Sequence, residues 1–136
     1  HAADGFMLVV SYNPGYQNLL KSLKPSTRQR FVAMSFGYPA PALEEAIVAA
    51  ESGVSPAEAR SLVSLAGALR RLTDHDLEET ASTRLLVMAG RLIAAGLDPA
   101  AACRAAIVEA LSDDAETVAA LAELVDAVLA PAGAAR

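Results

Sequence analysis

Three polar features of the sequence carry side chains of the kind that bind and position phosphate groups. Asn13 comes directly after an apolar run, residues 6–12. Arg28 and Arg30 lie just before a second such run, and arginine presents a planar fork of donors that matches a phosphate. Arg84 lies at the start of a helical pattern. If the apolar runs are strands of one open sheet, Asn13 follows a strand end, where such sheets bind ligands.

Asn13 and the arginine pair each have a simpler structural interpretation. An asparagine directly before Pro14-Gly15 is typical of a turn. Cations near the end of a short helix, as at Arg28 and Arg30, are favoured by the helix dipole. Taken alone, Asn13 favours the turn, and the arginine pair leaves both interpretations open.

Arg84 is harder to explain as a structural residue. It falls in the first turn of a predicted helix, where the helix dipole disfavours a cation by about 0.3–1 kcal/mol. An anion should therefore lie near its side chain. Glu78 or Glu79 could provide that charge, and so could the phosphate of a ligand. The sequence leaves these two explanations open.

The other residues able to do chemistry do not form a recognisable site. The sequence contains no Gly-x-x-x-x-Gly-Lys-Ser/Thr loop and no pair of acids at a predicted strand end. The acidic run 76–79 lies between predicted helices, so we expect it to be a solvated loop. His75 stands alone in this loop and Cys103 lies on an apolar helical stripe, so we expect both to be structural or solvated. With one cysteine and two distant histidines, no protein metal site is expected.

Two segments near the N-terminus have the pattern of buried parallel strands. Residues 6–12 are almost continuously apolar, and in residues 32–38 large side chains alternate with small ones. Between them, residues 16–31 are expected to contain a short helix capped by Ser26 or Thr27, within a connection long enough for a parallel crossover. Two strands do not make a stable sheet alone. We therefore expect this chain to be the C-terminal part of a longer α/β protein.

From Pro41 onward the sequence predicts only helices. Five segments combine helical spacing with boundary residues: about 42–52 ending at Gly53, one opening with the capping box Ser55–Glu58, one from near Ser82 to Gly96, one opening at Asp98-Pro99, and one opening with Asp113 and Glu116. The second has an apolar stripe from Leu62 to Leu72 and is expected to end before the polar stretch 73–80. The tail, residues 131–136, is expected to fray.

Composition and charge exclude several classes of protein. Apolar residues make up 54% and charged residues 20%, which is too apolar for intrinsic disorder, and 31 alanines favour closely packed helices. No apolar run reaches about 18 residues and no signal peptide is visible, so we expect no membrane insertion and a cytoplasmic location. Residues 1–31 carry a net charge of +3 and residues 32–136 one of −8. This balance argues against a general nucleic-acid binder.

The three polar features lie in longer motifs that resemble one family. These motifs are SYNPGYQ (11–17), LKPSTRQRF (23–31), ASTR (81–84), GLDPAAACR (96–104) and LSDD (111–114). Their order and wording resemble the CbbQ/NirQ/NorQ branch of the MoxR-type AAA+ ATPases. The resemblance extends from about Gly5 to Leu129, which is nearly the whole chain.

The resemblance implies a role for each candidate residue. Asn13 matches sensor 1, which helps to place the water that attacks the γ-phosphate. Arg30 matches the arginine finger that reaches the nucleotide of the neighbouring subunit, and Arg28 is a second candidate for this role. An arginine finger supplied in trans can be worth roughly 10³–10⁵ in rate. Arg84 matches sensor 2, which reports the γ-phosphate to the helical lid, and this role accounts for a cation in the first turn of a helix.

The resemblance also implies a fold, cofactors and partners. Residues 1–40 would be the C-terminal end of an AAA+ α/β core, with its last two parallel strands and a short connecting helix. Residues 41–136 would be the all-α lid subdomain. Members of this family use ATP and Mg²⁺ and form rings, usually hexamers. They work with a partner protein containing a von Willebrand factor A domain, and they activate Rubisco or assemble nitric oxide reductase.

The Walker A loop and the Walker B acids of this family are missing from the sequence. We therefore expect the 136-residue chain by itself to hydrolyse no ATP and to hold no cofactor. One alternative is a stand-alone, non-catalytic helical interaction module derived from such a motor. Another is a small nucleic-acid binder using residues 21–30, against which the acidic remainder of the chain argues.

Overall fold

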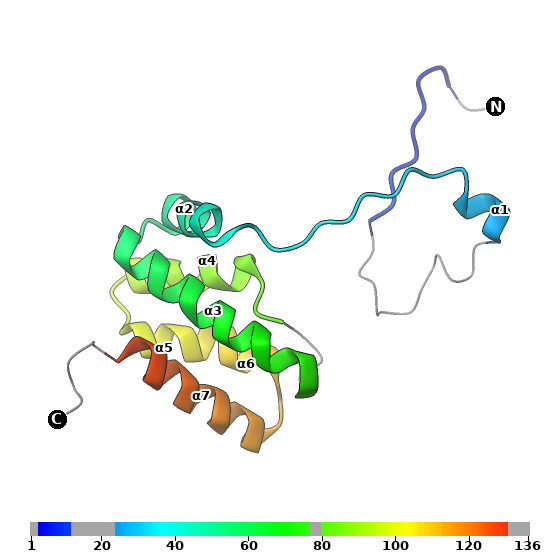
Figure 1. The fold of residues 1–136 in the computed structure, drawn as a ribbon. Coiled ribbons are helices and arrows are strands. Elements are labelled where there is room, and N and C mark those ends of the chain that lie inside the picture. The colour runs from blue at the N-terminus through cyan, green and yellow to red at the C-terminus, as the bar shows by residue number, and fades with distance from the viewer. Residues whose placement is uncertain (1–2, 12–23, 77–79, 131–136) are drawn as a thin grey trace. The chain divides into compact units, whose positions relative to one another are not determined.

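The structure, a computed structural model, describes residues 3–11, 24–76 and 80–130 (Figure 1). The chain divides into two compact units, His1–Phe36 and Gly37–Arg136. None of the described helices combines the length and the apolar character that crossing a membrane requires.

In the first unit the described residues contain one short helix, α1 (Pro25–Arg28). Proline suits a first helical position because it lacks an N–H that would go unpaired there. Ser26 and Thr27 therefore lie inside the helix, and the expectation that one of them caps it is wrong. The Thr27 N–H donates instead to the carbonyl oxygen of Lys24, at 2.8 Å.

The two expected strands are not formed in the described part of the chain. Residues 6–11 and 32–38 contain neither strand nor helix. Their large apolar side chains are exposed: Phe6, Met7, Leu8, Val9, Val10, Val32, Met34, Phe36 and Tyr38. A strand takes its backbone hydrogen bonds from neighbouring strands, and an isolated segment has none to take. The apolar pattern is present, but the sheet that it would complete is not.

The second unit is built of helices. They are α2 (Pro41–Ser52), α3 (Pro56–Asp76), α4 (Thr83–Ala94), α5 (Pro99–Cys103), η1 (Arg104–Val108), α6 (Glu109–Leu111) and α7 (Ala115–Leu129). The segments α5, η1 and α6 follow one another without a break, and η1 is a stretch of π-helix. Its wider turn brings Ala106, Ile107 and Val108, three consecutive residues, to the buried side.

Several helix ends lie where the sequence predicts them. The capping box forms, since the Ser55 N–H donates to Glu58 Oε2 at 2.8 Å and the Glu58 N–H donates to Ser55 Oγ at 3.3 Å. Helix α2 ends at Gly53 in the left-handed region, with φ +80°. Helix α4 ends in a Schellman motif, in which the N–H groups of Gly96 and Leu97 donate to Ile93 and Leu92.

Other boundaries differ from the prediction. Helix α3 continues to Asp76 and so includes half of the polar stretch that was expected to be a loop. Leu72, predicted to lie in the buried stripe, is 49% exposed, so the stripe of buried side chains ends at Leu69. Asp114 rather than Asp113 caps α7, since its carboxylate accepts from the Thr117 N–H.

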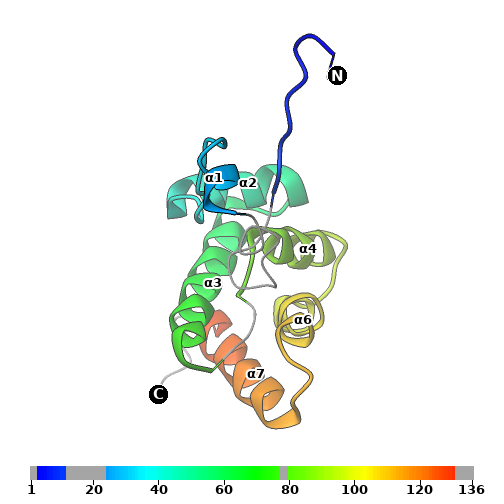
Figure 2. The ribbon, with the colours of Figure 1, turned by 90° about the vertical axis from the view of Figure 1, so that its right-hand side faces the viewer.

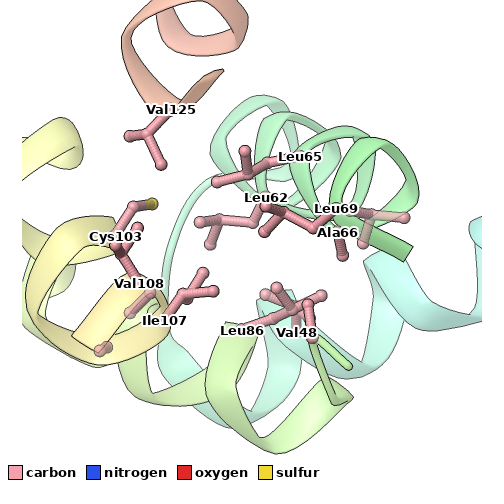
Figure 3. Close-up of a cluster of buried hydrophobic side chains, with 14 of the residues drawn as sticks. Val48, Leu62, Leu65, Ala66, Leu69, Leu86, Cys103, Ile107, Val108 and Val125 are labelled. Atoms are coloured by element: carbon pink, nitrogen blue, oxygen red, sulfur yellow. The ribbon is translucent and has the colours of Figure 1, made fainter. Parts of the chain in front are cut away.

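The hydrophobic core is formed around α3, which contacts α2, α4 and α7. Helix α7 runs beside α3 in both ribbon views (Figures 1 and 2). The core side chains come from each of these helices and from α5 and η1, as Figure 3 shows for Val48, Leu65, Leu86, Cys103, Ile107 and Val125. The structure therefore confirms a helical unit with its own core.

Helix α4 lies very close to α2. A Cβ atom on Gly90 would come within 2.5 Å of Ser52 Oγ, so only glycine fits at this crossing. The contact fixes the middle of α4 against the end of α2. It also helps to place the other end of α4, where Arg84 lies.

Candidate functional site

Arg84 is the second residue of α4, and its side chain is exposed. Ser82, at the N-cap position, makes no side-chain hydrogen bond to the helix. Among the described residues, no side chain forms an ion pair or hydrogen bond with Arg84. Glu78 and Glu79, the candidates for a neighbouring anion, lie outside the described residues. The start of α4 thus presents an exposed guanidinium together with the positive end of a helix dipole, a combination that suits an anion.

A buried ion pair lies directly behind this helix start. Glu44 in α2 is 1% exposed. Arg70 in α3 donates two hydrogen bonds to it, from Nη1 to Oε2 and from Nη2 to Oε1, both 2.8 Å long. The Thr83 hydroxyl donates a third to Glu44 Oε1, at 2.6 Å. Arg70 Nε also donates to the carbonyl oxygen of Ala81, at 2.8 Å.

Tyr38 extends this group to the chain that leads into α2. The guanidinium of Arg70 lies 3.6 Å from the centre of the Tyr38 ring, which is a cation–π contact. The Tyr38 hydroxyl shares a short hydrogen bond with the Thr80 hydroxyl. We call this group the Glu44–Arg70 network; its members are Tyr38, Glu44, Arg70, Thr80, Ala81 and Thr83.

The network keeps Glu44 ionised. The hydrogen bonds from Arg70 hold the pKa of Glu44 below its usual value of 4.5, and this effect outweighs the burial that would raise it. The hydrogen bond from Thr83 and the positive charge of Arg70 lower that pKa further. Glu44 is therefore a charged carboxylate, which Arg70 neutralises and to which Thr83, the residue before Arg84, donates a hydrogen bond.

The Glu44–Arg70 network could not be predicted from local sequence patterns, because its members are far apart along the chain. An acid in the first turn of a helix, such as Glu44, is ordinarily explained by the helix dipole. The signal that could have revealed it is spacing, since Glu44 lies four residues before Val48 and on the same buried face. Only the long-range contacts show that Arg70 is its partner.

The remaining predicted residues are located as follows. Asn13 lies outside the described residues. Arg28 is the last residue of α1, and Arg30 follows two residues later with an exposed side chain. These arginines belong to the first unit and Arg84 to the second. Three of the four candidates, Arg28, Arg30 and Arg84, thus lie within the described residues.

The described residues also contain no sign of a second chemical centre. Burial, followed by the negative charge of Asp98, raises the pKa of the Cys103 thiol to about 11, so this cysteine is a neutral core residue. His75 falls in the last turn of α3 rather than in a loop. No group of histidine, cysteine and acidic side chains within the described ranges could hold a metal ion.

The sequence matches one known protein family over most of the helical unit. The family model described as "CbbQ/NirQ/NorQ C-terminal" matches residues 44–128, which cover the helical unit from α2 into α7. The chain belongs to the CbbQ/NirQ/NorQ family. The matched region includes Glu44, Arg70 and Arg84.

Individual members of the CbbQ/NirQ/NorQ family are similar to most of this chain. The "Denitrification regulatory protein NirQ" of Pseudomonas aeruginosa is 64% identical over 125 residues, 92% of this chain and 48% of that protein. "Protein NorQ" of Paracoccus denitrificans is 56% identical over 93% of this chain and 47% of its own length. "Protein CbbQ" of Hydrogenophilus thermoluteolus is 53% identical over 83% of this chain and 42% of its own length. The chain spans about half the length of these relatives.

Proposed function

We propose that this sequence is the C-terminal part of an AAA+ ATPase that activates or assembles a metabolic enzyme complex. Residues 1–40 would contribute the last two strands of the α/β core, and residues 41–136 would form the lid. The observation that carries the proposal is Arg84, an exposed cation at the start of a helix, without a partner among the described residues and within the family's matched region. An arginine in this place has a physical reason if it meets a phosphate.

In the proposed full-length protein, ATP and Mg²⁺ bind between subunits of a ring, which we propose to be a hexamer. Arg84 contacts the γ-phosphate from the lid, and Asn13 helps to position the attacking water. Arg30, or Arg28, reaches the nucleotide of the neighbouring subunit and stabilises the charge of the transition state. The Walker loop and acids that hold the phosphates and Mg²⁺ come from the longer protein.

The names of the relatives support a choice between two target systems. NirQ is named as a denitrification regulatory protein, and two NirQ proteins match this chain at 64% and 63% identity. The match to CbbQ is 53%. We therefore place the assembly of nitric oxide reductase before the activation of Rubisco. In either case we propose a partner protein with a von Willebrand factor A domain.

The proposal is tested by ATP turnover of the full-length protein with Arg84→Ala. We expect kcat to fall about tenfold or more, which corresponds to about 1.4 kcal/mol of lost transition-state stabilisation. The matched control is Arg91→Ala, because Arg91 is an exposed arginine of the same helix that pairs with Glu51 at the surface. Equal turnover in the two variants would contradict a nucleotide role for Arg84 and favour an ordinary surface arginine.

The arginine finger is tested separately with Arg30→Ala and Arg28→Ala. The variant that removes the finger should bind nucleotide nearly as well as the unchanged protein and lose most of its turnover. Equal loss of binding and turnover would argue against a finger role. An unchanged rate of ATP hydrolysis in both variants would contradict a finger role for either arginine, whereas a full-length protein without any ATP turnover would favour the non-catalytic interaction module.

A further inference from the structure

The Glu44–Arg70 network makes its contacts immediately before Arg84. Arg70 binds the carbonyl oxygen of Ala81, and Glu44 accepts the hydroxyl of Thr83. The hydroxyl of Thr80 is held by Tyr38. Three of the four residues that precede Arg84 are thus fixed by side chains from α2, α3 and the chain before α2.

The start of helix α4 is held by the contacts of Ala81 and Thr83 with Arg70 and Glu44, and not by a side-chain cap. Ser82 makes no side-chain hydrogen bond to the first turn. Thr83 is the first residue of α4, and its hydroxyl donates a hydrogen bond to the buried carboxylate of Glu44 in α2. Arg84 is the next residue, so its backbone direction depends on where Glu44 and Arg70 hold Thr83 and Ala81.

A buried ion pair is a poor way to gain stability alone. Removing two charges from water is costly, and apolar residues of similar volume often serve the fold equally well. The pair does, however, hold a particular geometry, because Arg70 binds Glu44 with two parallel hydrogen bonds. The pair is therefore better suited to holding neighbouring residues in a defined orientation than to raising the free energy of unfolding.

We propose that Glu44 and Arg70 are positioning residues, which hold Thr83 and Ala81 in place and so aim Arg84 at the phosphate of a bound nucleotide. This inference rests on the proposed function of Arg84. Arg70 also contacts the segment that leads into α2, through its cation–π contact with Tyr38.

The most direct test removes one hydroxyl. Thr83→Val in the full-length protein keeps the shape of the side chain and removes the hydroxyl that donates to Glu44, but none of the atoms in the two Arg70–Glu44 hydrogen bonds. We expect kcat for ATP hydrolysis to fall about threefold or more while the thermal midpoint changes little. Thr83→Ser, which keeps the hydroxyl, is the matched control and should retain most of the rate. Equal rates in the valine and serine variants would overturn the proposal.

Combining Thr83→Val with Arg84→Ala shows whether the hydroxyl acts through Arg84. If it does, Thr83→Val has no further effect on kcat once Arg84 is gone. Independent, multiplying effects would overturn the positioning role and leave the proposed function of Arg84 standing. If Arg84→Ala alone leaves turnover unchanged, the proposed function itself fails, and the inference fails with it. The two failures are therefore distinguishable.

An apolar replacement of the pair separates stability from positioning. The double variant Glu44→Leu with Arg70→Met removes both charges together, so neither is left buried and unpaired. We expect its helical unit to stay folded, as measured by circular dichroism, and its kcat to fall at least as far as that of Thr83→Val. A folded double variant with the unchanged rate of ATP hydrolysis would overturn the proposal.

Discussion

Phe36 and Leu65 are both large apolar residues, but Phe36 is 87% exposed and Leu65 is fully buried. The difference extends to the units that contain them. In His1–Phe36 the apolar side chains of residues 6–10 and 32–36 are largely exposed. In Gly37–Arg136 the apolar side chains of the helices pack together into a hydrophobic core. A helix satisfies its own backbone and needs only side-chain contacts, while a strand also needs neighbouring strands. The helical unit therefore contains its own partners, and the first unit requires partners from the larger core that we propose.

The largest expected effect comes from core substitutions. Leu65→Ala should lower the free energy of unfolding of the chain by about 2–5 kcal/mol, because it leaves a cavity in a fully packed site. Phe36→Ala should change the same quantity by no more than about 0.5 kcal/mol, since its side chain is already in water. Urea denaturation of the 136-residue chain measures both. Similar losses in the two variants would contradict the contrast between the units.

Breaking the buried ion pair should have the next largest effect. Glu44→Gln removes the charge that neutralises Arg70, and we expect a loss of about 3 kcal/mol in unfolding free energy. The adjacent residue provides the control, because among the described residues the ion pair of Glu45 is with the exposed Arg60, at 3.6 Å. Glu45→Gln should cost about 0–1 kcal/mol. Equal effects in urea denaturation would show that Glu44 behaves as a surface acid.

Two glycines of the helical unit should respond in opposite directions to alanine. Gly90→Ala forces a Cβ atom against Ser52 at the α2–α4 crossing and should cost about 1–3 kcal/mol. Within α3, the Cβ atom of Gly67→Ala would meet, among the described residues, the end of the Arg71 side chain at 3.6 Å, an ordinary contact, and the substitution should stabilise by up to about 1 kcal/mol. Thermal unfolding of the chain compares the two. A stabilising Gly90→Ala would mean that α2 and α4 are less closely packed than described.

The helical unit should also lose stability in acid, because its buried Glu44 has a lowered pKa. Because the pKa of Glu44 is lower in the folded state than its usual 4.5, its contribution is fully present above that value and is lost as the pH falls through the folded-state pKa. Unfolding free energy should therefore decrease with acidification below about pH 4.5. Glu44→Gln should flatten this decrease, and Glu45→Gln should leave it unchanged. Identical pH profiles for both variants would exclude Glu44 as a cause.

The sequence predicted best those features that depend on neighbouring residues. The Ser55–Glu58 capping box and the helix ends at Gly53 and Gly96 are local hydrogen-bond patterns, and the structure confirms them. The assignment of the α7 cap to Asp113 was wrong by one residue, because both Asp113 and Asp114 are of a type that caps helices and it is Asp114 that accepts from the Thr117 N–H.

Features that depend on distant residues could not be predicted in the same way. The pairing of Glu44 with Arg70 joins positions 26 residues apart, and no local pattern indicates which buried acid meets which arginine. The strands at 6–12 and 32–38 were predicted from apolar side chains, but their formation depends on neighbouring strands. Arg84 was identified as a candidate from its place in a helix turn, while the network that holds the turn became visible only in the structure.

The contrast between the two units is tested most directly by amide hydrogen exchange of the 136-residue chain and of the full-length protein. We predict that amides of residues 7–10 and 32–36 exchange about 100-fold or more slowly in the full-length protein than in the chain, because neighbouring strands then accept their hydrogen bonds. Amides in the middle of α3 should be protected in both. Equal exchange rates of residues 7–10 and 32–36 in the two proteins would contradict the account of these segments as strands of a larger AAA+ core.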